Sequence, residues 1–250
     1  MEKVNGRFGT SNTESPCIYL ATSDQQGFDL ADRLELQVRE LSDAPKDWYL
    51  TCKNGKLTLD HPTEPSFQLS EQVIRSRIED AFRSDLAQAC GYYPGKTVLD
   101  CYGGWGIDGL ILAAAGCNVS MTEIHPVLCV FARDLAYQFN LKMNVICDDV
   151  KQFLHASDDR FDTIYLDPMF PTHPTTAKPQ RRMQILEQIA VPTQDLDTIF
   201  DLALRRANDR VVIKNRKNQR LLDQQADWKI KRRSVRFDVY LALNRPGFQE

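Results

Sequence analysis

The feature that most constrains the fold is a regular alternation of short apolar runs with longer amphipathic runs, which begins after Pro94-Gly95. The short runs have the composition of buried strands, and the longer ones repeat apolar residues at helical spacing. The expected strands are 97–101, 117–122, 144–147, 161–166 and 210–214, and the expected helices are 107–115, 126–139, 150–154 and 196–207. Strands that alternate with helices form a parallel, doubly wound α/β sheet. Two last strands, 228–233 and 236–243, follow each other closely and predict a hairpin that adds one antiparallel strand.

The residues before this alternation follow a different pattern and predict a small α+β extension over 1–65. A strand at 17–21 and a helix at 30–41 are expected there. Two further strands flank Asn54-Gly55, which is a strong signal for a two-residue hairpin turn. These elements predict a small mixed unit from Cys17 to about Thr63.

A linker separates the extension from the alternating region. Pro62 and Pro65 interrupt regular structure, and from Ser70 onward apolar residues recur at helical spacing until Gly91. Ser is a favoured N-cap and Gly a favoured helix terminator, so one helix is expected between them. We therefore predict a single α/β domain over residues 66–250 that begins with this helix.

Composition limits the cellular setting. None of the apolar stretches approaches the roughly 20 residues that span a bilayer, and residues 1–15 lack the apolar core of a secretion signal. The seven cysteines include no C-x-x-C pair and have no nearby His at zinc-ligand spacing. We therefore expect a cytoplasmic protein with reduced, mostly buried thiols, no disulfide, no metal and no membrane contact.

The charge is small overall but unevenly distributed. The net charge is −3, yet residues 205–236 contain twelve Lys or Arg and three Asp, whereas residues 1–204 contain eighteen basic and twenty-nine acidic side chains. Such an asymmetry is typical of a surface that faces a polyanion. It is also compatible with a solvated face of a helix and an edge strand. If the surface binds RNA, the candidate phosphate contacts are Lys214, Arg216, Lys217 and Arg220.

A glycine-rich turn follows the first strand of the alternating region. The strand leads into Asp100-Cys-Tyr-Gly103-Gly104-Trp105-Gly106, and a helix starts directly afterwards. Glycines allow close approach of the backbone to a ligand at a helix N-terminus. The spacing differs from the G-x-G-x-x-G of dinucleotide sites, and Asp100 would repel a pyrophosphate. A ligand with an amino-acid group and a sulfonium, as in S-adenosylmethionine (SAM), fits this acidic turn better.

Further acids stand near the ends of neighbouring strands. Glu123 ends the second strand, where a carboxylate can accept hydrogen bonds from ribose hydroxyls, and Asp148 and Asp149 follow the third, where adenine can be recognised. Asp108 lies just inside the first helix. Each acid could instead cap or favour a helix N-terminus. Because the acids lie in register at several strand ends, we predict a SAM site that also includes Gly103, Gly104 and Gly106.

The fourth strand ends in the most informative run, Asp167-Pro168-Met169-Phe170. It resembles the [Asp/Asn]-Pro-Pro-[Phe/Tyr] signature of methyltransferases that act on exocyclic amines. Such a nitrogen is poorly nucleophilic, and a carboxylate that accepts its N–H bonds stabilises the developing positive charge. Pro168 would stiffen the loop, and Phe170 would stack on a base taken out of its helix. The alternative is an Asp-Pro turn with no catalytic role.

Together these pieces resemble the bacterial 16S ribosomal RNA guanine-N2 methyltransferase J family, within the Rossmann-like SAM-dependent methyltransferases. The matching segments, in the family's order, are 98–106 with Asp108, 115–119, Glu123 with Pro126-Val127, 165–171, 210–214 and 236–240. The most specific of them is 166–171, in which Met replaces the second proline. The resemblance implies SAM contacts at Ile107, Asp108, Glu123, Ile124, Asp148, Asp149 and Asp167.

This sequence departs from the family pattern at three places. Ile107 stands where the family has Arg, and Asp148-Asp149 stands where it has a Ser pair. A basic segment ahead of the core is reduced to Arg75, Arg77 and Arg83. The resemblance implies methyl transfer from SAM to the N2 amine of a guanosine in 16S ribosomal RNA or the small subunit, with no protein partner inferred. The alternatives are an amino-methyltransferase for another RNA, DNA or small molecule, and a non-catalytic module that binds adenosyl ligands or RNA.

Overall fold

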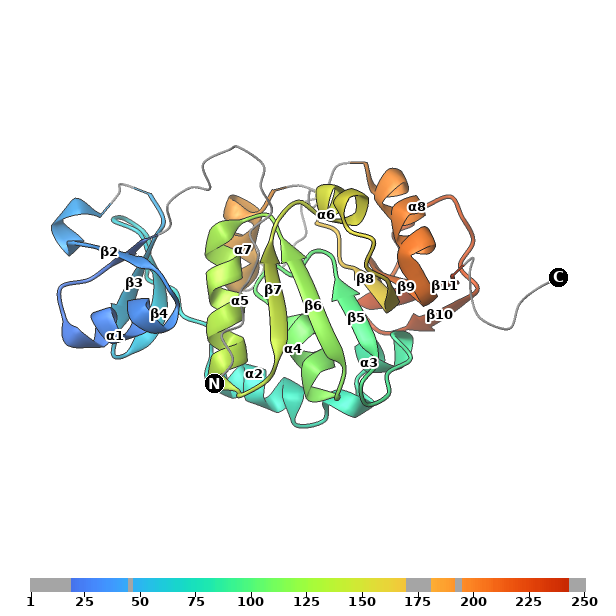
Figure 1. Ribbon diagram of the computed structural model, residues 1–250, viewed down its shortest axis with the longest axis horizontal. Coiled ribbons are helices and arrows are strands. Elements are labelled where there is room, and N and C mark those ends of the chain that lie inside the picture. The colour runs from blue at the N-terminus through green and yellow to red at the C-terminus, as the bar shows by residue number, and fades with distance from the viewer. Residues whose placement is uncertain (1–18, 45–46, 170–180, 192–194, 243–250) are drawn as a thin grey trace.

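The computed structural model describes residues 19–44, 47–169, 181–191 and 195–242, which form two β-sheets flanked by helices (Figure 1). The smaller sheet has the strand order β2-β1-β3-β4, and the larger has the order β10-β11-β9-β8-β5-β6-β7. The strands of the larger sheet are β5 (Thr97–Asp100), β6 (Asn118–Glu123), β7 (Met143–Cys147), β8 (Phe161–Leu166), β9 (Ala207–Arg216), β10 (Trp228–Lys231) and β11 (Val235–Leu241). Its helices are α4 (Ile107–Ala114), α5 (Pro126–Gln138), α6 (Val150–Ala156), α7 (Arg181–Ile189) and α8 (Leu196–Arg206).

The larger sheet has the predicted topology. Strands β5 to β9 are parallel, and β11 runs antiparallel between β9 and β10, so the closing hairpin places one strand in the opposite direction. The chain proceeds from β5 outward to β7 and then returns to the other side of β5 with β8. Ligands of such sheets bind at the carboxyl ends of the strands beside this reversal. Asp100 at the end of β5 and Asp167 after β8 therefore stand on either side of it.

The core lies on both faces of this sheet because successive strand residues point in opposite directions. Val98 and Val212 belong to the apolar cluster that contains α4 and α5. Their neighbours Leu99 and Val211 belong to a second cluster that contains α6 and α8. The near-continuous apolar runs of the sequence are thus explained by strands that are covered on both sides.

The N-terminal unit consists of β1 (Tyr19–Ala21), α1 (Gln25–Arg33), β2 (Gln37–Arg39), η1 (Leu41–Asp43), β3 (Tyr49–Lys53) and β4 (Lys56–Asp60). The hairpin at Asn54-Gly55 is confirmed, because both residues have positive φ (56° and 71°) between paired strands. The helix expected at 30–41 is wrong in its limits. Asp24 caps an earlier start by accepting from Gly27 N at 2.8 Å, and residues 37–39 pair with β1 instead.

The single helix expected between Ser70 and Gly91 is interrupted. The structure has α2 (Glu71–Ile78), η2 (Ala81–Arg83) and α3 (Asp85–Ala89) in its place. Ser84 has extended backbone and its hydroxyl accepts from Ala87 N at 3.1 Å, so it caps a new helix. The apolar spacing was continuous across this break, whereas the local capping preference of Ser decided the structure.

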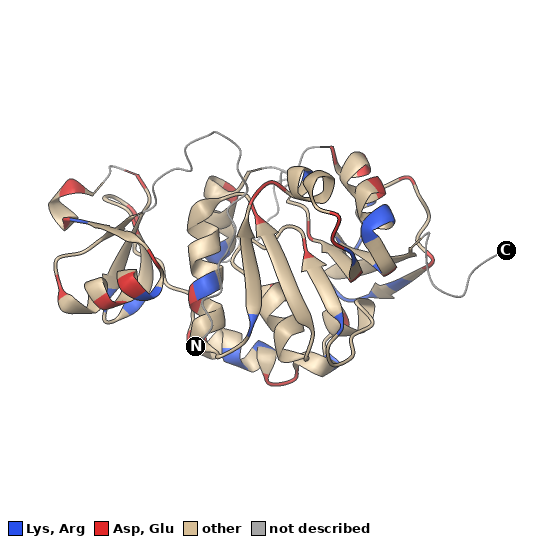
Figure 2. Ribbon diagram, in the orientation of Figure 1, with Lys and Arg blue, Asp and Glu red and all other residues tan. Residues whose placement is uncertain are grey.

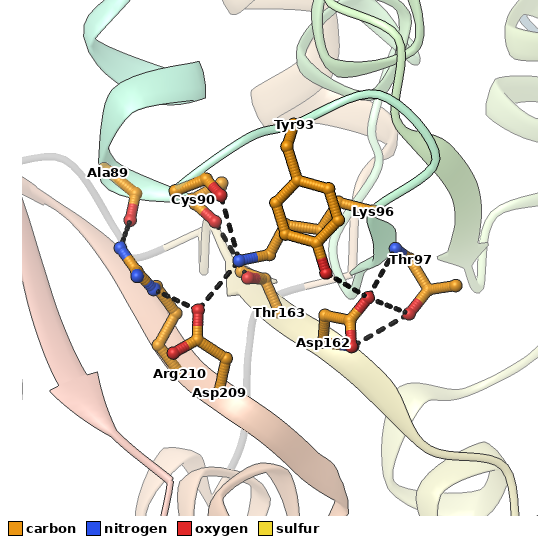
Figure 3. Close-up of polar contacts among 10 residues, drawn as sticks. Ala89, Cys90, Tyr93, Lys96, Thr97, Asp162, Thr163, Asp209 and Arg210 are labelled. Carbon is orange, nitrogen blue, oxygen red and sulfur yellow. Dashed lines mark hydrogen bonds and ion pairs between the residues drawn. The ribbon is translucent and has the colours of Figure 1, made fainter. Parts of the chain in front are cut away.

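Polar side chains tie the amino-terminal edge of the larger sheet together (Figure 3). The Lys96 side chain is buried, and its Nζ donates to Asp209 Oδ2 at 2.8 Å and to Gly91 O at 3.0 Å. Asp162 Oδ2 accepts from the Thr97 N and Oγ1 atoms, both at 2.9 Å. These contacts join the starts of β5, β8 and β9 at the edge opposite the strand ends that carry the predicted site.

The described cysteines are mostly buried, as expected, with one exception. Cys52, Cys90, Cys101, Cys117 and Cys129 are buried, whereas Cys147 is exposed at the end of β7. In the part of the chain that the structure describes, none of the helices has both the length and the apolar character that crossing a membrane requires.

Candidate active site

A pocket of about 1260 Å³ opens at the carboxyl ends of the parallel strands. It exceeds the roughly 300–1,000 Å³ of common small-molecule sites, which leaves room for part of a second substrate. Ten of the eleven predicted cofactor residues line it, namely Asp100, Gly103, Gly104, Ile107, Asp108, Glu123, Ile124, Asp148, Asp149 and Asp167. Pro168 lines it as well. Phe170, for which we predicted stacking, lies outside the described residues.

The glycine-rich turn is held by packing as well as by backbone geometry. Gly106 has φ 80° and precedes α4, and a Cβ there would lie 2.6 Å from Ala132 Cβ. Gly106 thus allows α4 and α5 to approach closely, behind the turn that lines the pocket. Trp105 packs between Phe67 and Phe131, with ring centroids 5.0 Å from each. The turn is therefore anchored in the apolar core through Trp105, which also borders the pocket.

Glu123 fixes the position of the glycine-rich turn from the neighbouring strand. Its Oε2 accepts from Gly104 N at 2.8 Å and its Oε1 accepts from His125 N at 2.7 Å. Burial raises the pKa of Glu123, although these backbone donors oppose the shift. Each carboxylate oxygen can accept a second hydrogen bond. Glu123 can therefore hold the turn and still accept from ligand hydroxyls in the pocket.

Asp100 is a buried acid without a counter-ion of its own. Its residue is 1% exposed, and neither carboxylate oxygen has a hydrogen-bond partner among the described residues. Burial, together with Asp108 and Asp167, holds the pKa of Asp100 well above its ordinary value. An unpaired buried acceptor is unfavourable unless a ligand supplies the donor. A cationic ligand with N–H groups, such as the amino-acid end of SAM, fits this position.

The two aspartates after β7 have different surroundings. Asp149 Oδ1 accepts from Gln152 N at 3.0 Å and caps α6, which is the capping alternative for such an acid. Asp148 Oδ1 accepts from Asp149 N at 2.8 Å and shapes the turn. Both residues line the pocket. Asp148 is thus the better placed of the two for a ligand contact, since Asp149 already stabilises a helix.

The acids at the other end of the pocket are joined by a lysine. Lys214 Nζ, from β9, lies 2.7 Å from Asp108 Oδ2 and 2.7 Å from Asp167 Oδ2. Tyr165 donates its hydroxyl to Asp108 Oδ2 at 2.8 Å. Burial alone would raise the pKa of Asp108, but Lys214 and Tyr165 lower it overall. Burial raises the pKa of Asp167 despite the opposing effect of Lys214. Lys214, which we expected to contact RNA phosphate, is instead engaged by two carboxylates.

The other predicted RNA contacts lie nearer the surface. Arg216 and Lys217, at and just after the end of β9, line the pocket and are exposed. Arg220 folds back on its own loop, where it donates to the carbonyls of Leu222 and Asp223. Figure 2 shows Lys and Arg on the β9 to β11 strands and on α8, where the basic residues are in the last turn and Asp197 is in the first. Part of the basic excess is therefore internal, and part faces solvent beside the pocket.

The structure adds pocket residues that sequence reasoning missed. Helix α7 forms a wall against the glycine-rich turn, where the Arg182 carbonyl accepts from Trp105 Nε1 at 3.1 Å. Leu186 of α7 and Arg77 of α2 also line the pocket. The apolar residues of α7, which include the buried Ile185 and Leu186, recur at helical spacing, and this pattern could have predicted the helix from the sequence. Among the described residues, no group of three or more His, Cys, Asp or Glu is arranged to hold a metal ion.

Comparisons with known proteins show which family the chain matches. Residues 29–242 match the family described as "Putative SAM-dependent methyltransferase". A ribosomal RNA small subunit methyltransferase J from Legionella pneumophila is 31% identical over 227 residues, which cover 85% of this chain and 90% of the relative. One from Coxiella burnetii is 35% identical over 157 residues, or 60% of this chain and 62% of the relative.

A solved structure has the same fold. The crystal structure of a SAM-dependent methyltransferase from Neisseria gonorrhoeae aligns with a TM-score of 0.70 and 22% sequence identity, and the alignment covers 93% of this chain and 99% of that one. The predicted Rossmann-like methyltransferase fold and the predicted cofactor are thus confirmed. The chain belongs to the family of SAM-dependent methyltransferases that includes ribosomal RNA small subunit methyltransferase J.

Proposed function

We propose that this enzyme transfers a methyl group from SAM to the exocyclic N2 amine of a guanosine in 16S ribosomal RNA. The observation that carries the proposal is the position of Asp167 and Pro168, which line the same pocket as the acids expected to hold SAM. The names of the relatives from Legionella and Coxiella support ribosomal RNA of the small subunit as the substrate. An RNA of this kind places the reaction in the cytoplasm.

The proposed cofactor contacts follow from the chemistry of the pocket. Glu123 accepts from the ribose hydroxyls while it holds the Gly104 backbone. Asp148 would accept from the adenine amino group, and Asp100 would accept from the α-ammonium of the amino-acid end. SAM supplies an electrophilic methyl group on a sulfonium, and the C–S electron pair remains on sulfur after transfer. The acids make the electrostatic potential in the pocket more negative, which favours the positively charged sulfonium.

Asp167 is the proposed contact to the reacting amine. A carboxylate oxygen that accepts an amine N–H directs the nitrogen lone pair toward the methyl carbon and stabilises the positive charge that develops on nitrogen. The Pro168 carbonyl can accept the second N–H. The nitrogen lone pair forms the new N–C bond, and the nitrogen then releases one proton. The stacking role of Phe170 remains a prediction from the sequence.

The proposed RNA surface consists of Arg216, Lys217 and Arg220. Arg216 and Lys217 line the mouth of the pocket and are exposed, so their charges can reach phosphates next to the target nucleotide. Contacts to phosphate supply affinity that falls steeply with salt, whereas the pocket selects the base. The side chain of Arg220 would have to leave the Leu222 and Asp223 carbonyls to take part.

The test compares Asp167→Ala and Asp167→Asn with the wild type, using SAM with a labelled methyl group. Total RNA, purified 16S RNA and small subunits serve as substrates, and digested nucleosides are identified by mass spectrometry. We expect N2-methylguanosine, a rate lower by about 10²–10³ in Asp167→Ala, and a smaller loss in Asp167→Asn, which keeps one acceptor. SAM affinity is measured in parallel. Full turnover of Asp167→Ala at saturating SAM would make Asp167 a cofactor ligand alone, and methylation of another nucleoside would refute the substrate.

A further inference from the structure

Lys214 joins two acids that come from distant parts of the sequence. Asp108 stands in the first turn of α4, and Asp167 follows the end of β8. Lys214 Nζ contacts Oδ2 of each at 2.7 Å, and its side chain is 24% exposed. Three elements are thus fixed to one another at the reacting end of the pocket. A lysine committed to two carboxylates is poorly placed to bind RNA phosphate as well.

We infer that Lys214 is a positioning residue for methyl transfer, which holds one oxygen of Asp167 in place so that the other remains available to the amine. The inference rests on the proposed role of Asp167. Lys214 occupies Oδ2, and no described residue donates a hydrogen bond to Oδ1. A carboxylate held through one oxygen cannot rotate freely, so the direction of Oδ1 is fixed as well, in a residue that lines the pocket. Fixed acceptors are more effective than mobile ones because they need no reorganisation during the reaction.

Lys214 also opposes protonation of Asp167. Lys214 is the group at hydrogen-bonding range of Asp167, and Asp108, Asp100 and Tyr165 also lie close enough to act on its charge. Tyr165 donates its hydrogen bond to Asp108, and Arg77 of α2 also acts on Asp108. Asp100 and Asp108 each disfavour a further negative charge nearby, whereas Lys214 compensates it. Without Lys214 the carboxyl would bind a proton at higher pH. A protonated Asp167 offers the amine a weaker acceptor and no compensating charge, so activity would be lost at the acidic end of the pH range.

The test measures kcat, KM, SAM affinity and RNA affinity from pH 5 to 9 for Lys214→Met, Lys214→Arg and the matched control Lys142→Met. Lys142 is an exposed lysine outside the pocket. We expect Lys214→Met to lower kcat by about 10–100-fold, as for loss of other groups that orient a reacting residue. The acidic limb of its kcat–pH profile should move to higher pH. The affinities for SAM and RNA should change by less than about threefold. Lys214→Arg, which keeps the charge, should recover part of kcat.

The double variant Asp167→Asn/Lys214→Met decides whether Lys214 acts through Asp167. It also removes one of the two carboxylates that Lys214→Met leaves uncompensated, while Asp108 keeps its hydrogen bond from Tyr165, so it is the variant to measure if Lys214→Met alone does not fold. An amide does not titrate, so Lys214→Met should cost far less in the Asp167→Asn background than in the wild type. An undiminished cost there, or a loss of RNA affinity with unchanged kcat, would overturn the inference. If Asp167→Ala itself keeps full turnover, the proposed amine contact fails. If Asp167→Ala is slow but Lys214→Met is not, the inference about Lys214 alone fails.

Discussion

Replacement of Asp100 by Asn should stabilise the free protein while it weakens cofactor binding. Asp100 is 1% exposed, its carboxylate has no hydrogen-bond partner among the described residues, and Asp108 and Asp167 add like charge nearby. Asparagine has nearly the same shape but carries no charge. Removal of the buried, uncompensated charge is worth about 1–3 kcal/mol, net of the unpaired amide that takes its place. The free energy of unfolding of Asp100→Asn should exceed that of the wild type by this amount at neutral pH.

The sign of the pH dependence follows from linkage. Burial holds the pKa of Asp100 in the folded protein above its unfolded value of about 3.9, so the folded state binds the proton more tightly. Below the unfolded pKa both states are protonated, and the charge costs nothing. As pH rises through the window between the two pKa values, the wild type progressively loses stability. The advantage of Asp100→Asn should therefore be small at acidic pH and largest above the folded-state pKa.

Urea denaturation followed by circular dichroism, at several pH values from 5 to 8, measures this effect. With a slope of about 3 kcal/mol per molar urea, the expected gain moves the midpoint by about 0.3–1 M. Asp162→Asn is the matched control. Burial alone would raise the pKa of Asp162, but hydrogen bonds from Thr97 lower it overall. The ionised carboxylate therefore stabilises the fold at neutral pH, and Asp162→Asn should be less stable than the wild type there. Calorimetry should show SAM affinity of Asp100→Asn reduced about 5–150-fold. Equal or lower stability of Asp100→Asn at pH 8 would refute the reasoning.

Two further variants, one single and one triple, test the pocket and the basic segment beside it. Glu123→Ala removes the carboxylate that accepts from the backbone N–H groups of Gly104 and His125. Calorimetry should show SAM binding weakened by about 1–3 kcal/mol and no detectable binding of NAD. Binding of NAD in place of SAM would contradict the assignment of the site. Neutral replacement of Arg216, Lys217 and Arg220 together should lower RNA affinity and flatten its salt dependence with SAM affinity unchanged. If filter binding showed an unaltered salt dependence of RNA affinity, this segment would be a solvated surface with no role in RNA binding.

Local patterns predicted the strands well because each buried strand carries its own apolar signal. The strand expected at 161–166 has the same limits as β8 (Phe161–Leu166). The acids at strand ends could also be assigned to one pocket, since parallel strands bring their carboxyl ends to one edge. The break before α3 was missed because the apolar spacing across Ser84 is continuous, and only the local cap distinguishes the two outcomes.

Pairings over long sequence distances could not be predicted in this way. The surroundings of Lys214 depend on Asp167 and Asp108, which are 47 and 106 residues away in the sequence. Arg232 likewise binds Asp85 across 147 residues, so another of the basic residues at 205–236 is neutralised by a distant acid. A count of charges in one segment overestimates its basic surface when the fold supplies partners from elsewhere.

The resulting charge arrangement explains how one pocket can serve a cationic cofactor and a polyanionic substrate. The interior contains Asp100, Asp108 and Asp167, whereas Arg216 and Lys217 stand at the exposed end of β9. A phosphate that entered the interior would meet negative potential in a poorly solvated space, whereas the basic rim attracts it. A neutral base meets no such barrier and can be turned out of its helix into the pocket. With the proposed function, the acidic interior would admit the base and keep the backbone outside, with the amine directed toward Asp167.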